Sequence, residues 1–272
     1  MRETRTHGTV HSFLTVLLVV LSGCSASNNA EPGSKVEEIQ QRDTLLIGTT
    51  GDYRPLSYLD PETNIYWGFD VDFAEIIGKD LGVEVKFVPT SWPTLTEDTQ
   101  NDKLFDLALC GITITEARKE TMLMSEGYLQ NGKTILCRKE QAGRYTNLDD
   151  INQPDVRVMV NPGGLNEKFA HENLPDAKII VHQRNEEIPS LIAEGKADIM
   201  ITEIVEASYY TQIDERLAAP LIEKPFNNSL MGVLMRKGDE DLLQRINSII
   251  DSCKKDSTLM RLHNKYGFKY NF

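Results

Sequence analysis

Short apolar runs alternate along the chain with longer segments whose apolar residues recur at helical spacing. The first unit has an apolar run at residues 44–50, a helical pattern at 70–82 and a second apolar run at 83–88. Gly82 ends the helical pattern, as glycine often does just beyond a helix. Strand, helix, strand repeats of this kind predict a parallel sheet with helices on its faces.

The alternation continues and restarts once, after Lys133. A last block, residues 230–267, gives one strand and two closing helices. Two α/β units with a return segment predict two lobes with a ligand cleft between them. The further expected strands are 105–113, 134–138, 156–160, 177–182 and 197–202, and the further expected helices are 93–102, one beginning at Asn166, 187–194 and 203–210.

The division into lobes follows from this restart. Lobe 1 is expected to take residues 44–129 and 227–272, and lobe 2 residues 130–226. In open sheets of this type ligands bind beyond the carboxyl ends of the strands. Those ends gather four polar segments, which are 49–53, 110–113, 161–164 and 201–203.

The N-terminal segment reads as an export signal. Arg2 and Arg5 precede an apolar stretch at residues 13–21 that ends in LSGC, which predicts a lipoprotein signal peptide over 1–23 and lipidation of Cys24. A plain cleaved signal peptide is the alternative. Either way the protein is expected outside the cytoplasm, as a periplasmic or cell-surface lipoprotein in the first case. The polar residues that follow, 24–43, suit a tether between a membrane anchor and the folded body.

Charge and cysteine content narrow the function classes. The net charge of −12 becomes −13 without residues 1–23, because that segment carries two arginines and one glutamate. An acidic surface argues against nucleic acid as a partner. Three cysteines remain after Cys24, namely Cys110, Cys137 and Cys253, and their spacing fits neither a metal site nor a Cys-x-x-Cys pair. Buried thiols are expected, with one disulfide as the alternative.

The segment NPGGLNEKFA, residues 161–170, places a glycine turn and two asparagines at a helix start. Unpaired backbone N–H groups at such a start favour an anion. The segment lacks the Gly-Lys-Ser/Thr of a Walker loop and the three glycines of a dinucleotide fingerprint. It is therefore either a binding site for a carboxylate or phosphate, or an ordinary helix start with a flexible loop.

Four segments resemble the family 3 extracellular solute-binding proteins, the amino-acid receptors of ABC transporters. They are GTTGDYRPLSY, GFDVDFAEIIGKDLGV, FDLALCGITITEARKETMLMSEGYL and GKADIMITE. Within that family the chain is most similar to the cyclohexadienyl dehydratases, on VPTSWPTL, NGKTILC and NQPDVRVMVNPGGLNEKFA. The resemblance covers essentially the whole mature length, and it implies a periplasmic-binding-protein-like fold.

This resemblance implies a lyase that uses no cofactor and no metal. The cyclohexadienyl dehydratases turn prephenate or arogenate into phenylpyruvate or phenylalanine, so the implied partner is a small dicarboxylate. The alternative is a binding protein that delivers an amino acid to a membrane permease of the ABC type. A lipid anchor favours this alternative, whereas the extra polar groups named below favour the enzyme.

The resemblance also assigns roles to single residues. Arg118 and Thr113 are expected to hold a carboxylate, which the planar guanidinium fork matches. Lys133 supplies a second cation for a dicarboxylate; as an isolated residue it would be a surface charge. Tyr53 is placed over the ligand, and Trp92 walls the pocket or packs in the core. Gly111, Asn161 and Gly164 are further expected substrate contacts, and Asn166 is expected to line the cleft as a catalytic residue, as are Lys133 and Glu206.

Glu203 and Glu206 are three residues apart at a helix start, which would place both carboxylates on one face, toward the cleft. Receptors of this family place an acid at the first position to pair with a ligand ammonium, and Glu206 matches the general acid of the enzyme branch. Two nearby carboxylates and an apolar wall would raise one pKa. The alternative is a solvated pair favoured by the helix dipole.

Two departures from the family pattern concern substrate preference more than fold. The return segment reads KPFNNSLMGVLM instead of an acidic, lysine-containing stretch. Glu203 stands where an aspartate is commoner, and its extra methylene shifts the carboxylate.

Overall fold

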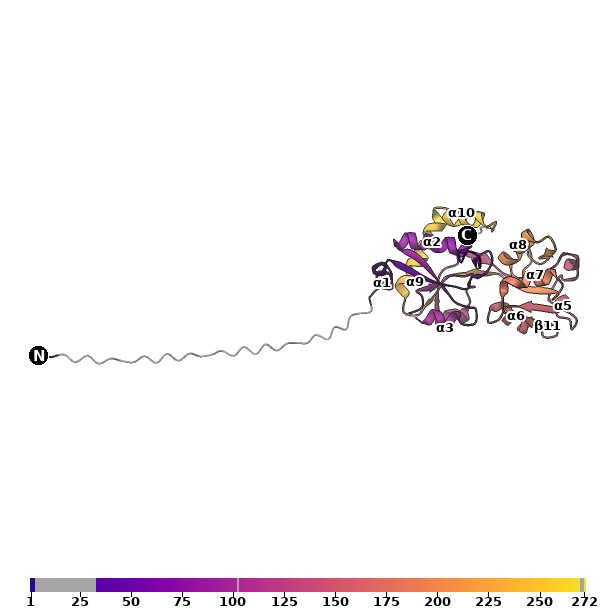
Figure 1. Cartoon of the computed structure of the whole chain (residues 1–272), viewed down its shortest axis with the longest axis horizontal. Coiled ribbons are helices and arrows are strands. Elements are labelled where there is room, and N and C mark those ends of the chain that lie inside the picture. Colours follow the sequence, from indigo (N-terminus) through magenta and orange to yellow (C-terminus); the bar gives the residue numbers. More distant parts are fainter. Residues whose placement is uncertain (3–32, 102, 270–271) are drawn as a thin grey trace. The chain divides into compact units, whose positions relative to one another are not determined.

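The structure is a computed structural model that describes residues 1–2, 33–101, 103–269 and 272. Its folded part, Gly33–Phe272, contains two five-stranded sheets with helices packed on them (Figure 1). Within the described part of the chain, no helix has the length and apolar character needed to cross a membrane.

The first sheet has the strand order β5-β1-β6-β15-β7. β1 runs parallel to β5 and β6, and β15 runs antiparallel to β6 and β7. The strands are β1 Thr44–Thr49, β5 Glu84–Pro89, β6 Leu107–Ala108, β7 Met122–Met124 and β15 Leu234–Arg236. The helices of this lobe are α1 Lys35–Arg42, α2 Phe69–Leu81, α3 Leu95–Gln100, α4 Glu116–Thr121, α9 Glu240–Lys255 and α10 Thr258–Lys265.

The second sheet has the order β11-β10-β12-β9-β13. Its strands are β9 Lys133–Arg138, β10 Arg157–Val160, β11 Lys178–Val181, β12 Ile199–Glu203 and β13 Leu217–Ala218. The helices are η1 Lys139–Arg144, α5 Leu148–Ile151, α6 Leu165–Asn173, η2 Asn185–Glu187, α7 Ile188–Ala193 and α8 Ile204–Ile213. Ile199 and Ile201 of β12 enter one core cluster and Met200 enters the other. Both faces of this strand are covered, which explains its unbroken apolar run.

The chain passes between the lobes through a two-stranded ribbon. β8 Leu129–Asn131 and β14 Ser229–Met231 pair antiparallel, with Leu230 opposite Gln130. The single strand predicted near residue 230 is therefore two strands, because the chain leaves the ribbon at Gly232 and enters the first sheet as β15. The strand predicted over 105–113 is likewise shorter, and its end forms a loop.

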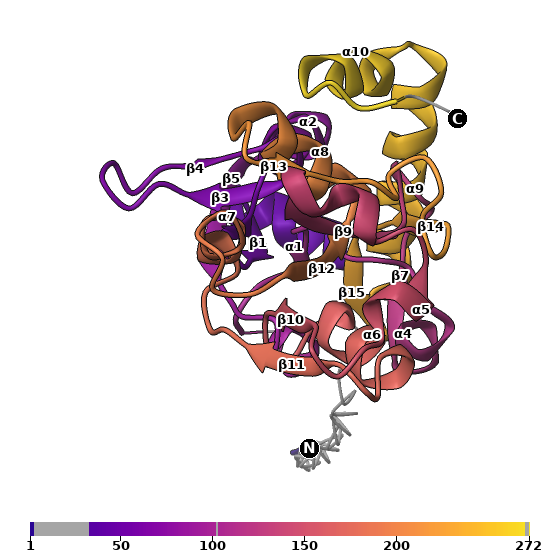
Figure 2. The ribbon, with the colours of Figure 1, turned by 90° about the vertical axis from the view of Figure 1, so that its right-hand side faces the viewer.

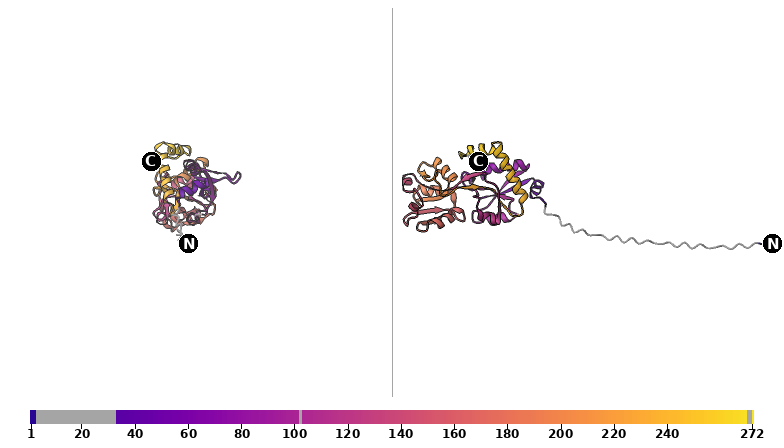
Figure 3. Two further views of the ribbon diagram at one scale, coloured as in Figure 1. Left: turned by 90° about the vertical axis from the view of Figure 1, so that its left-hand side faces the viewer. Right: turned by 180° about the vertical axis from the view of Figure 1, so that it is seen from behind.

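A small three-stranded sheet flanks the first lobe. It consists of β2 Asp52–Tyr53, β3 Ser57–Leu59 and β4 Tyr66–Trp67. Figure 2 shows the β3–β4 hairpin reaching out from the body of the fold. The back view in Figure 3 shows α9, from the end of the chain, lying across the first lobe, where it packs on α1 and α2.

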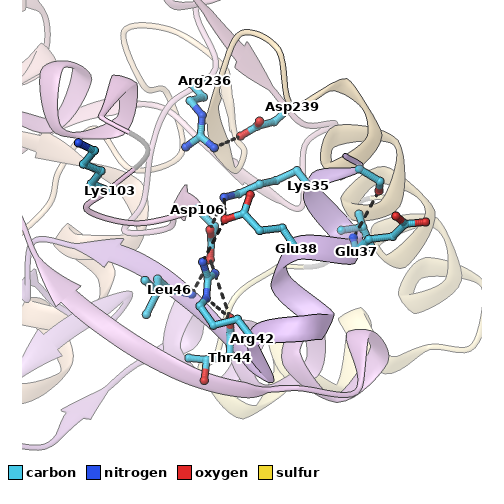
Figure 4. Close-up of polar contacts among 12 residues, drawn as sticks. Lys35, Glu37, Glu38, Arg42, Thr44, Leu46, Lys103, Asp106, Arg236 and Asp239 are labelled. Atoms are coloured by element: carbon cyan, nitrogen blue, oxygen red, sulfur yellow. Dashed lines mark hydrogen bonds and ion pairs between the residues drawn. The ribbon is translucent and has the colours of Figure 1, made fainter. Parts of the chain in front are cut away.

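The tether predicted over 24–43 is wrong from Lys35 onward, because Lys35–Arg42 form a helix docked on the first lobe. Ile39 is fully buried, and Asp106 pairs with both Lys35 and Arg42 (Figure 4). One buried isoleucine in a polar segment was too weak a signal to predict docking. The predicted lipidation site Cys24, residues 3–23 of the signal peptide and the tether to residue 32 lie outside the described residues.

Candidate active site

A narrow cavity of about 30 Å³ lies between the lobes, at the carboxyl ends of the strands. Ten of the eleven predicted site residues line it; Glu206 does not. Two lining residues, Leu165 and Asn185, were not predicted. The full lining is Tyr53, Trp92, Gly111, Thr113, Arg118, Lys133, Asn161, Gly164, Leu165, Asn166, Asn185 and Glu203.

The first lobe contributes a guanidinium that forms no ion pair with any carboxylate of the described residues. Arg118 lies in α4 and donates from Nη1 to the carbonyl oxygen of Thr113 at 2.6 Å. It takes part in none of the ion pairs found among the described residues. Burial lowers the pKa of Arg118, so loss of water contact is the main effect on this side chain. An unpaired, partly buried guanidinium is suited to bind an anion.

Gly111, which lines the cavity with Arg118, has no side chain, and this lets the ring of Tyr53 pack closely against its backbone. Its φ is +75°, and a Cβ there would lie 2.6 Å from the ring of Tyr53. The N–H of Gly111 donates to Oδ2 of Asp70 at 2.5 Å. Burial raises the pKa of Asp70 to about 7. The Tyr53 ring in turn packs edge-on against Trp92, with ring centroids 5.8 Å apart, so both aromatic residues form one wall of the cavity.

The second lobe contributes a buried cation and anion on neighbouring strands. Lys133 of β9 lies opposite Glu203 of β12 in the antiparallel register. Lys133 Nζ donates to Oε1 of Glu203 at 2.8 Å and to Oδ1 of Asn166 at 2.5 Å. The backbone N–H of Lys133 donates to Oδ1 of Asn227 at 2.8 Å. The divergent return segment therefore positions this lysine.

Glu203 receives hydrogen bonds from both lobes. Besides Lys133, its carboxylate accepts from the hydroxyl of Tyr53, from Oγ1 of Thr113 at 3.1 Å and from Nδ2 of Asn131 at 3.0 Å. Burial alone would raise the pKa of Glu203, but Lys133 and the hydroxyl donors outweigh it, and the pKa is lowered. Glu203 is therefore ionised near neutral pH.

Glu206 lies behind the cavity wall and is fully buried. Its carboxyl group contacts Thr202 Oγ1, and its Oε1 accepts from Nδ2 of Asn185 at 2.8 Å. Burial raises its pKa from 4.5 to about 8, and the charges of Asp52 and Glu203 add to the rise. The expected raised pKa is thus present, so this carboxyl group is largely protonated near neutral pH.

The prediction that Glu203 and Glu206 share one face is wrong. Positions three apart share a face only when both are helical. Glu203 has extended backbone, with φ −124° and ψ 159°, and α8 begins at Ile204. Glu203 therefore points into the cavity, whereas Glu206 points behind Asn185.

The NPGG turn lies at the start of α6, where Gly164 is the N-cap residue. Gly164, Leu165 and Asn166 place the first turn of the helix on the cavity, and Asn161 is buried beside it. Gly163 has φ +75°, and a Cβ there would lie 2.6 Å from Cα of Pro93 in the other lobe. The turn is thus both a wall of the cavity and a point where the lobes meet.

Asn185 was missed because it lies among charged residues that read as an exposed loop. It is only 2% exposed, and its Nδ2 also donates to the carbonyl oxygen of Asp52 in the first lobe, at 3.2 Å. Its Oδ1 is buried without a hydrogen-bond partner among the described atoms. The one available signal was topological, since Asn185 follows the carboxyl end of β11.

The cysteines agree with one of the two expectations. Cys110, Cys137 and Cys253 are free and buried, so the buried-thiol prediction is confirmed and the disulfide alternative is wrong. Burial raises the pKa of Cys110 and of Cys137 to about 12. In the described part of the chain, no group of three or more His, Cys, Asp or Glu side chains could hold a metal ion.

Comparison with known proteins identifies one family, and the similar proteins within it include an enzyme and an amino acid-binding protein. Residues 45–269 match the family model "Bacterial extracellular solute-binding proteins, family 3". A cyclohexadienyl dehydratase of Pseudomonas aeruginosa is 37% identical over 248 residues, covering 91% of each chain. The resemblance to this enzyme is therefore confirmed.

The solved structures similar to the chain include two ancestral proteins. An ancestral amino acid-binding protein, described as a precursor of cyclohexadienyl dehydratase, has a TM-score of 0.80 at 38% identity and covers 87% of this chain and 100% of its own. An ancestral cyclohexadienyl dehydratase has a TM-score of 0.53 at 50% identity and covers 86% of this chain and 96% of its own. The predicted periplasmic-binding-protein-like α/β fold is confirmed by these matches.

Proposed function

The chain belongs to the bacterial extracellular solute-binding proteins of family 3, and from that premise we propose that it is a lyase acting on prephenate, arogenate or both. The identity with the dehydratase of Pseudomonas aeruginosa supports a carbon–oxygen lyase of the cyclohexadienyl dehydratase type. The observation that carries the proposal is Glu206, a fully buried carboxyl group with a pKa of about 8 directly behind the cavity wall.

The reaction needs one proton and no redox partner. Prephenate carries a carboxylate and a hydroxyl group on opposite carbons of its ring. The bond from the ring to the carboxylate breaks and releases carbon dioxide, and its electron pair makes the ring aromatic. The bond from the ring to the hydroxyl oxygen breaks at the same time, and a proton converts the departing hydroxide to water. An acid that is protonated near neutral pH is therefore required.

The cavity residues divide this work. Arg118 binds the side-chain carboxylate of the substrate through the guanidinium N–H groups that it does not donate to Thr113. Lys133 Nζ lies 2.5 Å from Oδ1 of Asn166, and these two side chains orient the rest of the substrate by hydrogen bonds. Asn161, Gly164 and the first turn of α6 supply neutral donors that leave the proton donor unaffected.

The proton of Glu206 reaches the substrate through a change at Asn185. Nδ2 of Asn185 donates hydrogen bonds to Oε1 of Glu206 and to the carbonyl oxygen of Asp52, and these two acceptors belong to different lobes. Movement of the lobes on substrate binding shifts this amide and exposes the carboxyl group to the leaving hydroxyl. The same movement would widen the cavity of about 30 Å³, which has room for roughly two or three water molecules, so that the substrate can enter.

The second candidate is an amino-acid-binding protein of an ABC transporter. The similarity to an ancestral amino acid-binding protein favours it, as would an anchor at Cys24. The family is extracellular, so either function is carried out outside the cytoplasm. Lipidation of Cys24 would keep the protein at the membrane surface.

Paired kinetics and calorimetry on Glu206→Gln separate the two functions. The variant keeps the shape and a hydrogen-bond donor but loses the acidic proton, so turnover of prephenate should fall by roughly 100-fold or more while binding persists. Glu194→Gln, the same change at an exposed position, is the control and should keep full turnover. Turnover of Glu206→Gln within a few-fold of the wild type would remove Glu206 from the mechanism. A wild type that binds an amino acid and turns over neither substrate would establish the receptor.

A further inference from the structure

The carboxylate of Glu203 has no free acceptor site for a ligand. An ionised carboxylate offers about four lone-pair positions. Glu203 accepts four hydrogen bonds from protein donors, which are Lys133, Tyr53, Thr113 and Asn131. One of these donors is itself a cation, and it lies 2.8 Å from Oε1.

Glu203 is also the only acid among the twelve residues that line the cavity, against two cations, Arg118 and Lys133. Of the acids just outside the lining, Glu206 has its pKa raised to about 8 by burial. Burial raises the pKa of Asp52 too, and its Oδ1 accepts from Nε1 of Trp92 at 3.1 Å. The lining therefore has an excess of positive charge and no available anion.

Thr113 contacts both Arg118 and Glu203 and therefore sets their relative position in the cavity. Its carbonyl oxygen accepts from Arg118 at 2.6 Å, and its hydroxyl donates to Glu203 at 3.1 Å. A ligand carboxylate on Arg118 therefore has its neighbouring carbon beside Glu203 and Lys133. The substituent on that carbon is the one group that distinguishes an α-keto acid from an α-amino acid.

These contacts favour a keto oxygen at that carbon. Lys133 uses two N–H bonds, toward Glu203 and Asn166, so its third can donate to a keto oxygen. An ammonium group would meet the like charge of Lys133, and it could reach Glu203 only by displacing one of the four donors that occupy its acceptor positions. Like charges held together in a closed site oppose binding strongly.

We propose that this site selects α-keto acids over α-amino acids, and that the Lys133–Glu203 pair determines the selection. The preferred substrate is then prephenate, with arogenate disfavoured. The identity of the substrate rests on the proposed lyase function, whereas the selection itself is a property of the cavity and is testable without turnover.

Calorimetry with phenylpyruvate and L-phenylalanine tests the selection, since the two compounds differ only at the α-carbon. The wild type should bind phenylpyruvate tighter by roughly 100-fold, and kcat/KM should favour prephenate over arogenate in the same sense. Lys133→Met removes the cation and frees one acceptor position of Glu203, so the preference should shrink at least about tenfold. Lys139→Met, at the exposed residue after β9, is the matched control and should keep the wild-type preference.

The outcomes are distinguishable. L-Phenylalanine binding to the wild type as tightly as phenylpyruvate overturns the selection, as does an unchanged preference in a folded Lys133→Met variant. Should Lys133→Met not fold, the wild-type affinities alone decide. A protein that prefers phenylpyruvate but turns over neither prephenate nor arogenate keeps the selection and refutes the lyase.

Discussion

Glu206 predicts how activity depends on pH, because its burial raises its pKa to about 8. A general acid works only while it holds its proton, so kcat should be constant below that pH and fall about tenfold per unit above it. The measurement is a pH profile of kcat with saturating prephenate. A kcat that rises through pH 8 would mean that the group acts as a base, or that another residue supplies the proton.

The same shift affects stability, and its sign follows from the proton balance. The folded state keeps the Glu206 proton up to about pH 8, whereas the unfolded chain releases it near 4.5. The wild type therefore loses stability as pH rises through this window, and Glu206→Gln does not. Denaturation measured at pH 5 and at pH 9 gives the free energy of unfolding of each protein. Between pH 5 and pH 9 this free energy should fall by about 4 kcal/mol more for the wild type than for the variant. An equal change in both proteins would place Glu206 in contact with water.

Some residues of the site can be predicted from the sequence and others cannot. Arg118 and Lys133 could be assigned to the cleft because the family motif and the predicted order of strands both place them there. Asn185 could not be, since its role depends on Glu206 and Asp52, which are distant in sequence. The orientation of Glu206 depended on whether Glu203 belonged to the strand or the helix, and spacing alone does not decide such a boundary.

The start of α6 gives a prediction about lobe closure. Gly163→Ala would place a methyl group about 2.6 Å from Pro93 in the opposite lobe, so the closed state should be opposed and prephenate should bind at least about tenfold more weakly. Gly195→Ala is the matched control. Gly195 has φ +76°, so it carries the same backbone strain, but its nearest neighbour is Arg138 at 3.5 Å. Equal losses in both variants would assign the effect to strain rather than closure.

Helix α1 gives a prediction about stability. Asp106 is 1% exposed and pairs with Lys35 and Arg42, so Asp106→Asn should lower the free energy of unfolding by about 3 kcal/mol. Glu38 pairs with the same two cations but its side chain is 57% exposed, so Glu38→Gln should cost less than about 1 kcal/mol. Urea titration measures both. A small loss for Asp106→Asn would mean that α1 contributes little to the fold.

Elements with strong patterns could be predicted, and those that depend on distant partners could not. The run at 197–202 predicted a buried strand because both of its faces are covered. The break at Gly232 and the docking of α1 were missed. The first depends on pairing with β8, and the second on a charge network that joins residues 35, 42 and 106.

At the scale of the whole molecule, one carboxylate receives hydrogen bonds from both lobes. Tyr53 and Thr113 come from the first lobe, and Lys133 from the second, and all three donate to Glu203. The full chain has a net charge of −12, so the two cations that line the cavity form a local exception. Electrostatic attraction to this cavity should guide an anionic substrate despite the net negative charge.

Turnover of prephenate by the purified mature protein tests the central claim most directly. The assay follows phenylpyruvate by its ultraviolet absorbance in base, with excess chelator and no added nucleotide. The expected result is phenylpyruvate and carbon dioxide in equal amounts, at an undiminished rate in chelator, since general-acid catalysis by Glu206 requires neither metal nor cofactor. No phenylpyruvate above the spontaneous rate, from protein that binds an amino acid in calorimetry, would contradict the lyase and establish a receptor.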